Sequence, residues 1–280
     1  MSKVKGQRSK VLLTGGGTGG HIYPLLAVAK KIIEIGKLKN WEIELRYYGP
    51  ESHYNNLLRQ EEIKICWVMG AKLRRYFSLL NLLDIFKFCL AIWQSLWYLI
   101  WWRPDVAFSK GGTGALPVLL ACRFYGIPII IHESDAVMGL TNKISSRWAA
   151  KIFQSWGPDG VGIPLREEML TAARDPNLPV IAKRKLGFEI EKPLILVIGG
   201  SQGSQRINEF IFQNLPELLE KYQVLHQVGE TNFTESKIII SNIPACNPPT
   251  SYRITASFTA EEMAKAYAAS DLIISRAGSI

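Results

Sequence analysis

The sequence has few of the residues that build disulfide frameworks or metal centres. Its 280 residues include four cysteines and four histidines, and it contains no CxxC pair, HExxH motif or DxD motif. The cysteines are scattered, at Cys66, Cys89, Cys122 and Cys246. Isolated cysteines indicate reduced thiols in a reducing compartment. We therefore expect a site without a metal or another cofactor, in which amide dipoles and arginine act on the ligand.

The N-terminus lacks the apolar core and cleavage site of a secretory signal. Residues 1–10, MSKVKGQRSK, are basic and lead directly into an apolar strand, which argues against secretion. Apolar residues make up 48% of the chain, which excludes general disorder. The length allows one large domain or two ordinary ones.

The positive charge lies entirely in the first half of the chain. Residues 1–150 carry 20 Lys and Arg against 10 Asp and Glu, whereas residues 151–280 carry 13 against 14. A basic half of this kind indicates a nucleic acid, an anionic membrane or a phosphorylated substrate as a partner.

Short apolar strands alternate with helical patterns along the chain. In the first half we expect strands at 10–14, 42–48, 105–109, 127–132 and 151–154, and helices at 25–35 and 116–125. In the second half we expect strands at 194–198, 224–228, 253–257 and 271–275, with helices ending near 221 and spanning 260–269. The last helix begins with the capping box of Thr259 and Glu262. Apolar strands separated by helices predict an α/β fold with parallel sheets.

The segment WGPDGVGIP, residues 156–164, is rich in glycine and proline and predicts a domain boundary. We place the domains at 1–163 and 164–280. The chain ends with RAGSI, in the loop after the last expected strand and before an expected helix. We therefore expect the second domain to be cut short.

Three glycine-rich turns follow expected strands, at 15–20, 111–114 and 199–203. The first satisfies the dinucleotide pattern GxGxxG, but the strand at 42–48 lacks the acid that should end it in a nicotinamide-binding fold, because Glu42 and Glu44 come too early. Each turn taken alone is compatible with a simple tight turn. Three turns in two α/β domains favour a phosphate-containing ligand held from both sides.

A few polar residues lie where such folds bind ligands. His21 ends the first glycine turn and is a candidate proton acceptor, although its ring could instead brace the loop. The pair His132 and Glu133 ends another strand, where Glu133 serves either catalysis or the architecture of the loops. Arg166, just past the expected boundary, is the best cationic candidate to bind a phosphate.

Residues 72–103 contain an unusual apolar stretch. Residues 85–102 include four of the eight tryptophans, and Lys72, Arg74 and Arg75 precede them. The length permits a transmembrane helix, but a strand of the sheet follows immediately; a core-packed helix is the plain alternative. We favour a helix exposed at the membrane interface, where tryptophan and basic residues meet anionic lipid.

The segments GGTGGHIYPLLAVA, GGTGALPVLLACRFYGIPIIIHESDAVMGLTNK and VIGGSQGSQRIN resemble the signature segments of the MurG family. These enzymes transfer N-acetylglucosamine from UDP to undecaprenyl-pyrophosphoryl-muramyl-pentapeptide (lipid I), which gives lipid II for peptidoglycan synthesis. The resemblance extends from about Lys10 to Ile280. It implies a GT-B fold of two Rossmann-like domains facing across a cleft, inversion without an obligate metal, and peripheral attachment to the cytoplasmic face of the cell membrane.

The resemblance also implies roles for individual residues. His21 matches the base that activates the muramyl hydroxyl, and Arg166, Ser201 and Gln202 match the residues that hold the UDP diphosphate. The matched donor-binding residues are Thr18, Gly19, Gly20, Asp135, Arg166, Ser201, Gln202, Phe258, Thr259, Met263, Ser279 and Ile280. The matched acceptor-binding residues are Gly17, Gly111, Gly112, Thr113 and Asn142.

The chain departs from the family pattern at three places. Asp135 stands where the family has an amide, and Thr113 stands where it has an aromatic ring. The ribose-binding Glu and the Gln residues that meet the sugar would follow Ile280, so we expect a chain ending there to bind UDP-GlcNAc weakly and to turn over poorly.

Three other functions remain open. A UDP-sugar:diacylglycerol glycosyltransferase would share this fold, and a non-catalytic, membrane-associated binding module would share its surface. Nucleic-acid binding fits the basic half, but the aromatics there gather in one apolar stretch rather than alternating with arginine. We therefore expect no nucleic-acid partner.

Overall fold

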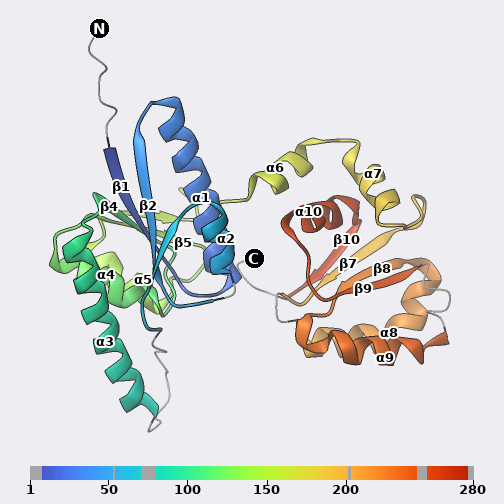
Figure 1. Ribbon diagram of the computed structural model, residues 1–280. Coiled ribbons are helices and arrows are strands. Elements are labelled where there is room, and N and C mark those ends of the chain that lie inside the picture. The colour runs from blue at the N-terminus through green and yellow to red at the C-terminus, as the bar shows by residue number, and fades with distance from the viewer. Residues whose placement is uncertain (1–7, 53, 71–79, 201–202, 245–250, 277–280) are drawn as a thin grey trace. The chain divides into compact units, whose positions relative to one another are not determined.

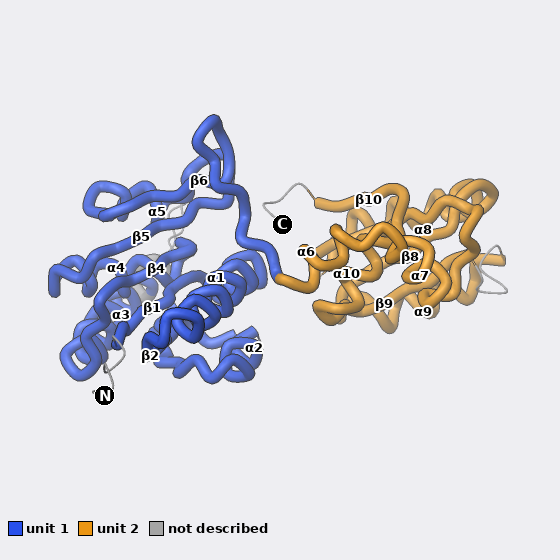
Figure 2. Tube along the Cα trace, turned by 90° about the horizontal axis from the view of Figure 1, so that it is seen from above, with its two compact units in different colours: residues 1–166, 279–280 blue, residues 167–278 orange. Residues whose placement is uncertain are grey.

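The structure is a computed structural model that describes residues 8–52, 54–70, 80–200, 203–244 and 251–276, and of residues 80–83 only the backbone. It comprises a first unit that ends at Arg166 and a second that begins at Glu167 (Figure 2). This division falls three residues beyond the expected boundary, so Arg166 belongs with the first unit.

The first unit is a parallel six-stranded sheet with helices on both faces (Figure 1). The strand order is β3-β2-β1-β4-β5-β6. Its strands are β1 (Arg8–Thr14), β2 (Glu42–Gly49), β3 (Lys64–Trp67), β4 (Val106–Ser109), β5 (Ile129–Glu133) and β6 (Lys151–Gln154). Its helices are α1 (Gly19–Leu38), α2 (Asn55–Gln60), α3 (Leu80–Trp101), α4 (Ala115–Phe124) and α5 (Leu140–Ser145), with a 3-10 turn at Ser146–Trp148.

Alternation along the strands divides the apolar residues of this unit into two cores. Leu12 and Tyr48 belong to the core beneath α3 and α4. Their neighbours Leu13 and Tyr47 belong to the core beneath α1 and α2. All four side chains are fully buried, which is why the carboxyl-terminal parts of β1 and β2 carry adjacent apolar residues rather than alternating ones.

Helix α1 begins earlier than its apolar pattern predicts. Thr18 has extended backbone angles and acts as the N-cap, and the helix starts at Gly19. Pro24 therefore lies in the second turn of the helix. Because proline has no N–H, the carbonyl of Gly20 receives no helical hydrogen bond from it.

Helix α3 has two apolar faces. Ala91, Ser95 and Leu99 are buried and pack toward α4 and the sheet. On the other side Trp93 is 62% exposed and Trp101 75% exposed. Within the described part of the chain, no helix combines the length and the hydropathy of a membrane-spanning segment.

The second unit is a smaller parallel sheet, of order β10-β7-β8-β9. Its strands are β7 (Leu194–Ile198), β8 (Gln223–Gln227), β9 (Tyr252–Thr255) and β10 (Leu272–Ser275). Its helices are α6 (Glu167–Arg174), α7 (Leu178–Lys185), α8 (Gln205–Lys221), α9 (Phe233–Ser241) and α10 (Ala260–Ala269), with a 3-10 turn at Glu230–Asn232. The expected capping box of Thr259 and Glu262 is formed at the start of α10.

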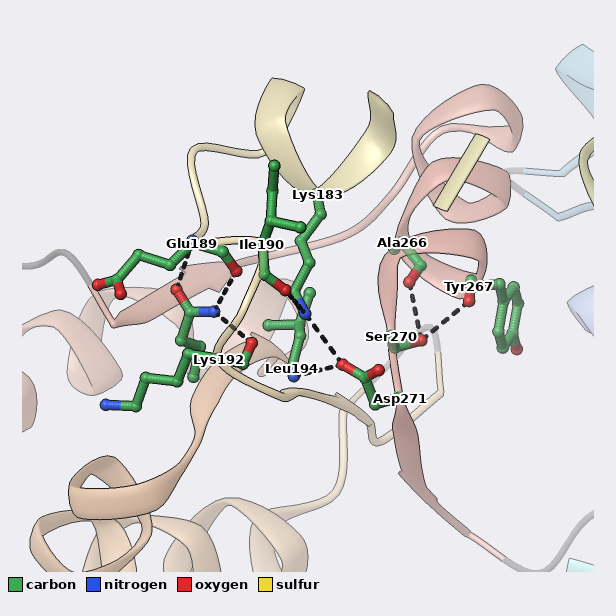
Figure 3. Close-up of polar contacts among 10 residues, drawn as sticks. Lys183, Glu189, Ile190, Lys192, Leu194, Ala266, Tyr267, Ser270 and Asp271 are labelled. Carbon is green, nitrogen blue, oxygen red and sulfur yellow. Dashed lines mark hydrogen bonds and ion pairs between the residues drawn. The ribbon is translucent and has the colours of Figure 1, made fainter. Parts of the chain in front are cut away.

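A polar network fixes the amino ends of β7 and β10 (Figure 3). The buried ammonium of Lys183 lies 3.1 Å from Asp271 Oδ2 and donates to the carbonyl of Ile190 at 3.0 Å. Asp271 Oδ2 also accepts from the Leu194 amide at 2.8 Å. Beside it, the Gln223 side chain bonds both backbone groups of Glu189. This network lies at the end of the sheet opposite to Gly199, which follows the carboxyl end of β7.

We expect the buried His226 to make the second unit sensitive to acid. Its imidazole lies between Tyr252 Oη and Asn208 Oδ1, each at 3.0 Å, and burial lowers its pKa to about 4. The unfolded chain binds a proton near pH 6.5, so stability is complete above pH 6.5 and falls by up to about 3 kcal/mol as the pH drops to 4. Chemical denaturation between pH 6.5 and 4 measures the free energy of unfolding, with His226→Gln as the control. An equal fall of this free energy with pH in the two proteins would contradict the prediction.

Candidate active site

The candidate site of the first unit lies at the carboxyl ends of β1, β4 and β5. Thr14 pairs with Ser109, and Ser109 pairs with Ile131, so the three strands end side by side. The strand order reverses between β1 and β4, which is where open α/β sheets bind their ligands. The loops that follow these strands therefore meet at one place.

These loops enclose a cavity of about 240 Å³. Its volume suits part of a sugar or a phosphate rather than a whole nucleotide sugar. It is lined by His21, Lys110, Gly112, Thr113, Glu133, Asp135, Gly139, Leu140, Thr141 and Asn142. The cavity thus brings together five residues expected in the site: His21, Gly112, Thr113, Asp135 and Asn142.

His21 enters the cavity from the first turn of α1. Its Nδ1 lies 2.8 Å from Thr18 Oγ1. The tautomer with its proton on Nδ1 donates to Thr18 and leaves the Nε2 lone pair available to accept a proton. Burial lowers the pKa of His21, and the charge of Lys110 lowers it further, whereas Asp135 and Glu133 raise it. The imidazole is therefore neutral at pH 7.

Gly112 is required by its backbone and by its neighbours. Its φ is +87°, a conformation that side chains rarely tolerate. A Cβ there would lie 2.9 Å from His21 Nε2 and from the backbone of Gly16. Glycine at this position therefore leaves the Nε2 of His21 uncovered.

Lys110 follows β4 and places an ammonium in the wall of the cavity. Its Nζ lies 2.8 Å from His132 Nδ1 and also donates to Ser134 Oγ. Burial lowers the pKa of Lys110 to about 8, although Glu133 and Asp135 raise it. At pH 7 this group is mostly charged.

Glu133 organises the loop that closes the cavity. Its Oε1 accepts from the Asp135 amide at 3.0 Å. Its Oε2 accepts from the Gly139 amide at 3.0 Å and from Asn142 Nδ2 at 2.9 Å. The carboxylate is buried and both of its oxygens are engaged, so its contacts are those of an architectural residue. The same bond satisfies Nδ2 of the buried Asn142 side chain, whereas its Oδ1 has no hydrogen-bond partner among the described residues.

The cavity can bind hydroxyl groups and accept a proton from one of them. It offers a neutral imidazole at His21, an exposed carboxylate at Asp135 and an ammonium at Lys110. A carboxylate accepts hydrogen bonds from hydroxyls, and a neutral imidazole removes their protons. Among the described residues, no group of three or more His, Cys, Asp and Glu side chains is arranged to hold a metal ion.

Other predicted residues lie outside the cavity wall. Gly17 approaches Pro50 and Ser52, and Gly19 approaches Tyr54. Gly20 lies in the first turn of α1, and Gly111, with a φ of +75°, lies against the Asn142 side chain. The guanidinium of Arg166 stacks on the ring of Tyr23, 4.4 Å from its centroid. This contact fixes Arg166 beside the turn that begins α1.

The predicted nucleotide residues lie in the second unit. Phe258 and Met263 are partly buried against the core on the α10 side, and Thr259 caps α10. Gly203 has a φ of +76°, and a Cβ there would lie 2.1 Å from the carbonyl of Val228, so glycine alone fits this turn. Ser201, Gln202, Ser279 and Ile280 lie outside the described residues.

Sequence reasoning missed Lys110 and its partner Ser134. The available indication was position, since each follows a strand that ends at the ligand-binding edge of the sheet. A lysine beside glycines gave no indication that its ammonium would be buried.

Models of two family domains match the chain. The glycosyltransferase family 28 N-terminal domain matches residues 11–154, and the family 28 C-terminal domain matches residues 194–280. A UDP-N-acetylglucosamine--N-acetylmuramyl-(pentapeptide) pyrophosphoryl-undecaprenol N-acetylglucosamine transferase of Clostridium kluyveri is 37% identical over 96% of this chain and 73% of its own length. The chain belongs to glycosyltransferase family 28.

Solved structures place this family-28 glycosyltransferase in the GT-B fold. MurG from Acinetobacter baumannii has a TM-score of 0.64 and 27% identity, covering 97% of this chain and 74% of its own. A UDP-GlcNAc 2-epimerase from Methanocaldococcus jannaschii has a TM-score of 0.62 at 10% identity, covering 95% of this chain and 78% of its own, which shows a shared fold alone. The resemblance to the MurG family is confirmed.

Proposed function

We propose that the chain transfers N-acetylglucosamine from UDP-N-acetylglucosamine to the muramyl hydroxyl of undecaprenyl-pyrophosphoryl-MurNAc-pentapeptide. The relatives with this name, 37% identical in the first case, support the substrates. The single observation in the structure that favours it is the neutral His21 in a cavity at the switch point of the sheet. This is where a sugar hydroxyl can lose its proton.

In the proposed reaction, the muramyl oxygen attacks the anomeric carbon of the donor sugar. The bond from that carbon to the UDP oxygen breaks, UDP leaves with the electron pair, and the configuration inverts. His21 takes the hydroxyl proton. Asp135 accepts hydrogen bonds from sugar hydroxyls, since a carboxylate facing a diphosphate would repel it.

The donor and acceptor residues divide between the two units. Gly17, Gly111, Gly112, Thr113 and Asn142 form the acceptor side, and Thr18, Gly19 and Gly20 meet both substrates. For the donor diphosphate the family resemblance supports Arg166, through its guanidinium, and Ser201 and Gln202, which lie outside the described residues. Phe258, Thr259 and Met263 lie where the uracil binds.

A transfer assay tests this function. UDP-N-acetylglucosamine with a radiolabelled sugar is offered with a short-chain analogue of the muramyl lipid, or with diacylglycerol. Both this chain and the chain continued through any coding sequence after Ile280 are assayed. A disaccharide product from either form supports the proposal. Glycosylated diacylglycerol would favour the rival lipid glycosyltransferase, and donor binding without transfer by either form would favour a binding module.

We also propose that α3 attaches the enzyme to the membrane surface. Trp93, Trp97 and Trp101 recur every four residues on its exposed side, with neighbouring ring centroids 6.1 and 5.9 Å apart. Ile100 is 58% exposed beside them. Tryptophans on one helix face suit the headgroup layer, and the basic half of the chain suits anionic lipid. Lys72, Arg74 and Arg75, expected to assist, lie outside the described residues.

Replacing the three tryptophans tests the attachment. We expect Trp93→Gln, Trp97→Gln and Trp101→Gln together to weaken binding to phosphatidylglycerol vesicles at least about tenfold, because exposed rings lose their burial in the headgroup layer. Vesicle co-sedimentation measures it. Phe210→Gln with Ile238→Gln, which changes exposed apolar residues of the second unit, is the control. If the triple variant and the unchanged chain sedimented equally with the vesicles, the proposal would be wrong.

A further inference from the structure

Lys110 is buried in the cavity wall without a carboxylate partner. It is 4% exposed, and the structure records no ion pair for it among the described residues. Its ammonium is held by an imidazole and a hydroxyl instead. A buried charge without a counter-ion is costly, so its retention needs a reason beyond packing.

The neighbouring carboxylates are committed elsewhere or point to solvent. Glu133 uses both oxygens for Asp135 N, Gly139 N and Asn142 Nδ2. Asp135 is exposed. Both lie close enough to influence Lys110 and His21 electrostatically without bonding to either. The cavity therefore holds two negative charges around the His21 imidazole and one positive charge.

His132 fixes the position of the ammonium. Its Nε2 donates to the carbonyl of Gly162 at 3.0 Å, so its Nδ1 carries a lone pair that accepts from Lys110 Nζ. Burial lowers the pKa of His132, and Lys110 lowers it further, so the ring stays neutral. Ser134 holds the ammonium from a second direction.

The position of the His21 ring in the cavity wall is also fixed by its contacts. Thr18 bonds its Nδ1, and its ring lies so close to Gly16 and Gly112 that a Cβ at either position would come within 3.0 Å of it. Fixed charges therefore act on a fixed imidazole, and they add to the effect of burial on its pKa.

We propose that Lys110 is a positioning residue of the transfer reaction, which offsets the charges of Glu133 and Asp135 and so keeps the His21 imidazole unprotonated. The inference rests on the proposed function, in which His21 accepts the hydroxyl proton. Without the ammonium, two carboxylates would act unopposed on the imidazole, and a protonated imidazole cannot serve as the base.

Titration of the histidine ring signals by NMR tests this in the substrate-free chain. The His21 signals are assigned by their loss in His21→Gln. We expect Lys110→Met to raise the pKa of His21 by about one unit. If the methionine variant fails to fold, Lys110→Gln takes its place. It keeps a hydrogen-bond donor without the charge and should also raise the pKa of His21. Lys110→Arg should leave the pKa near its starting value.

Lys143→Met is the matched control, because it removes the same charge from an exposed position on α5. It should leave the His21 titration unchanged. In the transfer assay, the acid limb of kcat/KM should move up with the His21 pKa in Lys110→Met and not in Lys143→Met. An unchanged His21 titration in folded Lys110→Met or Lys110→Gln would overturn the inference. If the titration shifts as expected but neither the unchanged chain nor its longer form transfers the sugar, the proposed function is wrong.

Discussion

Replacing His21 by alanine is expected to lower kcat for sugar transfer by about 10²- to 10⁴-fold, the usual contribution of a general base. The imidazole is neutral and lies in the cavity wall, and removing it leaves the muramyl hydroxyl without a proton acceptor. Binding of UDP-N-acetylglucosamine should change little, because the residues proposed to meet the uracil, Phe258, Thr259 and Met263, lie in the second unit. Transfer kinetics and calorimetric donor binding, in whichever form of the chain is active, separate the two effects.

The pH dependence gives an independent check on the same residue. Since the pKa of His21 is lowered from 6.5, kcat/KM of the unchanged enzyme should hold constant at neutral pH and decline only below pH 6.5. Thr18→Val removes the hydroxyl partner of Nδ1 but keeps the imidazole, so it should cost less than His21→Ala. If His21→Ala kept near-normal kcat, the ring would be a brace for the loop and another group would be the base.

Glu133→Ala should clearly destabilise the first unit. It leaves the buried Asn142 amide without its acceptor, at about 1–3 kcal/mol, and it also removes the acceptor of the Asp135 and Gly139 amides, which belong to exposed residues and cost less because water can reach them. We expect a combined loss of about 2–4 kcal/mol, which corresponds to a fall in Tm of about 10 °C for a unit of this size. Thermal unfolding followed by circular dichroism measures it.

Two variants make the result specific. Glu133→Gln keeps one carbonyl oxygen but turns an NH2 group toward a donor, so its Tm should lie between those of the alanine variant and the unchanged chain. Glu34→Ala removes an exposed acid from α1 and should shift stability by less than about 1 kcal/mol. A loss of transfer by Glu133→Ala at unchanged Tm would instead indicate a catalytic carboxylate.

Much of the fold follows from the sequence because the buried parts of parallel strands are runs of apolar residues. The strands at 151–154 and 194–198 and the helix at 260–269 match the observed bounds. Strand β3 was missed, since KICW carries only two strongly apolar residues and lies at the edge of the sheet. Helices α2, α5, α6, α7 and α9 were missed as well; α2 and α5 are six residues long.

The sequence predicted the site residues that the backbone conformation of a turn requires. It did not predict residues whose role depends on burial in the folded chain. Glycine turns after strands led to Gly112 and to His21. The sequence left two roles open for Glu133, and the contacts of its two oxygens favour the architecture of the loops. The buried ammonium of Lys110 depends on three-dimensional contacts that no local pattern records, because lysine is common on surfaces and its residue type alone favoured a solvated position.

The order of strands in the first unit also sets when its cavity can form. Arg8 reaches Glu44 on the neighbouring β2, 36 residues away. On the other side of β1, the amide of Lys10 bonds Asp105, 95 residues away. Closing the longer loop costs more chain entropy, so the pairing of β1 with β2 is available well before the seam between β1 and β4. During synthesis, the residues of α1 and β2 therefore emerge and associate first, and the cavity at that seam is completed only after β4 and β5 have left the ribosome.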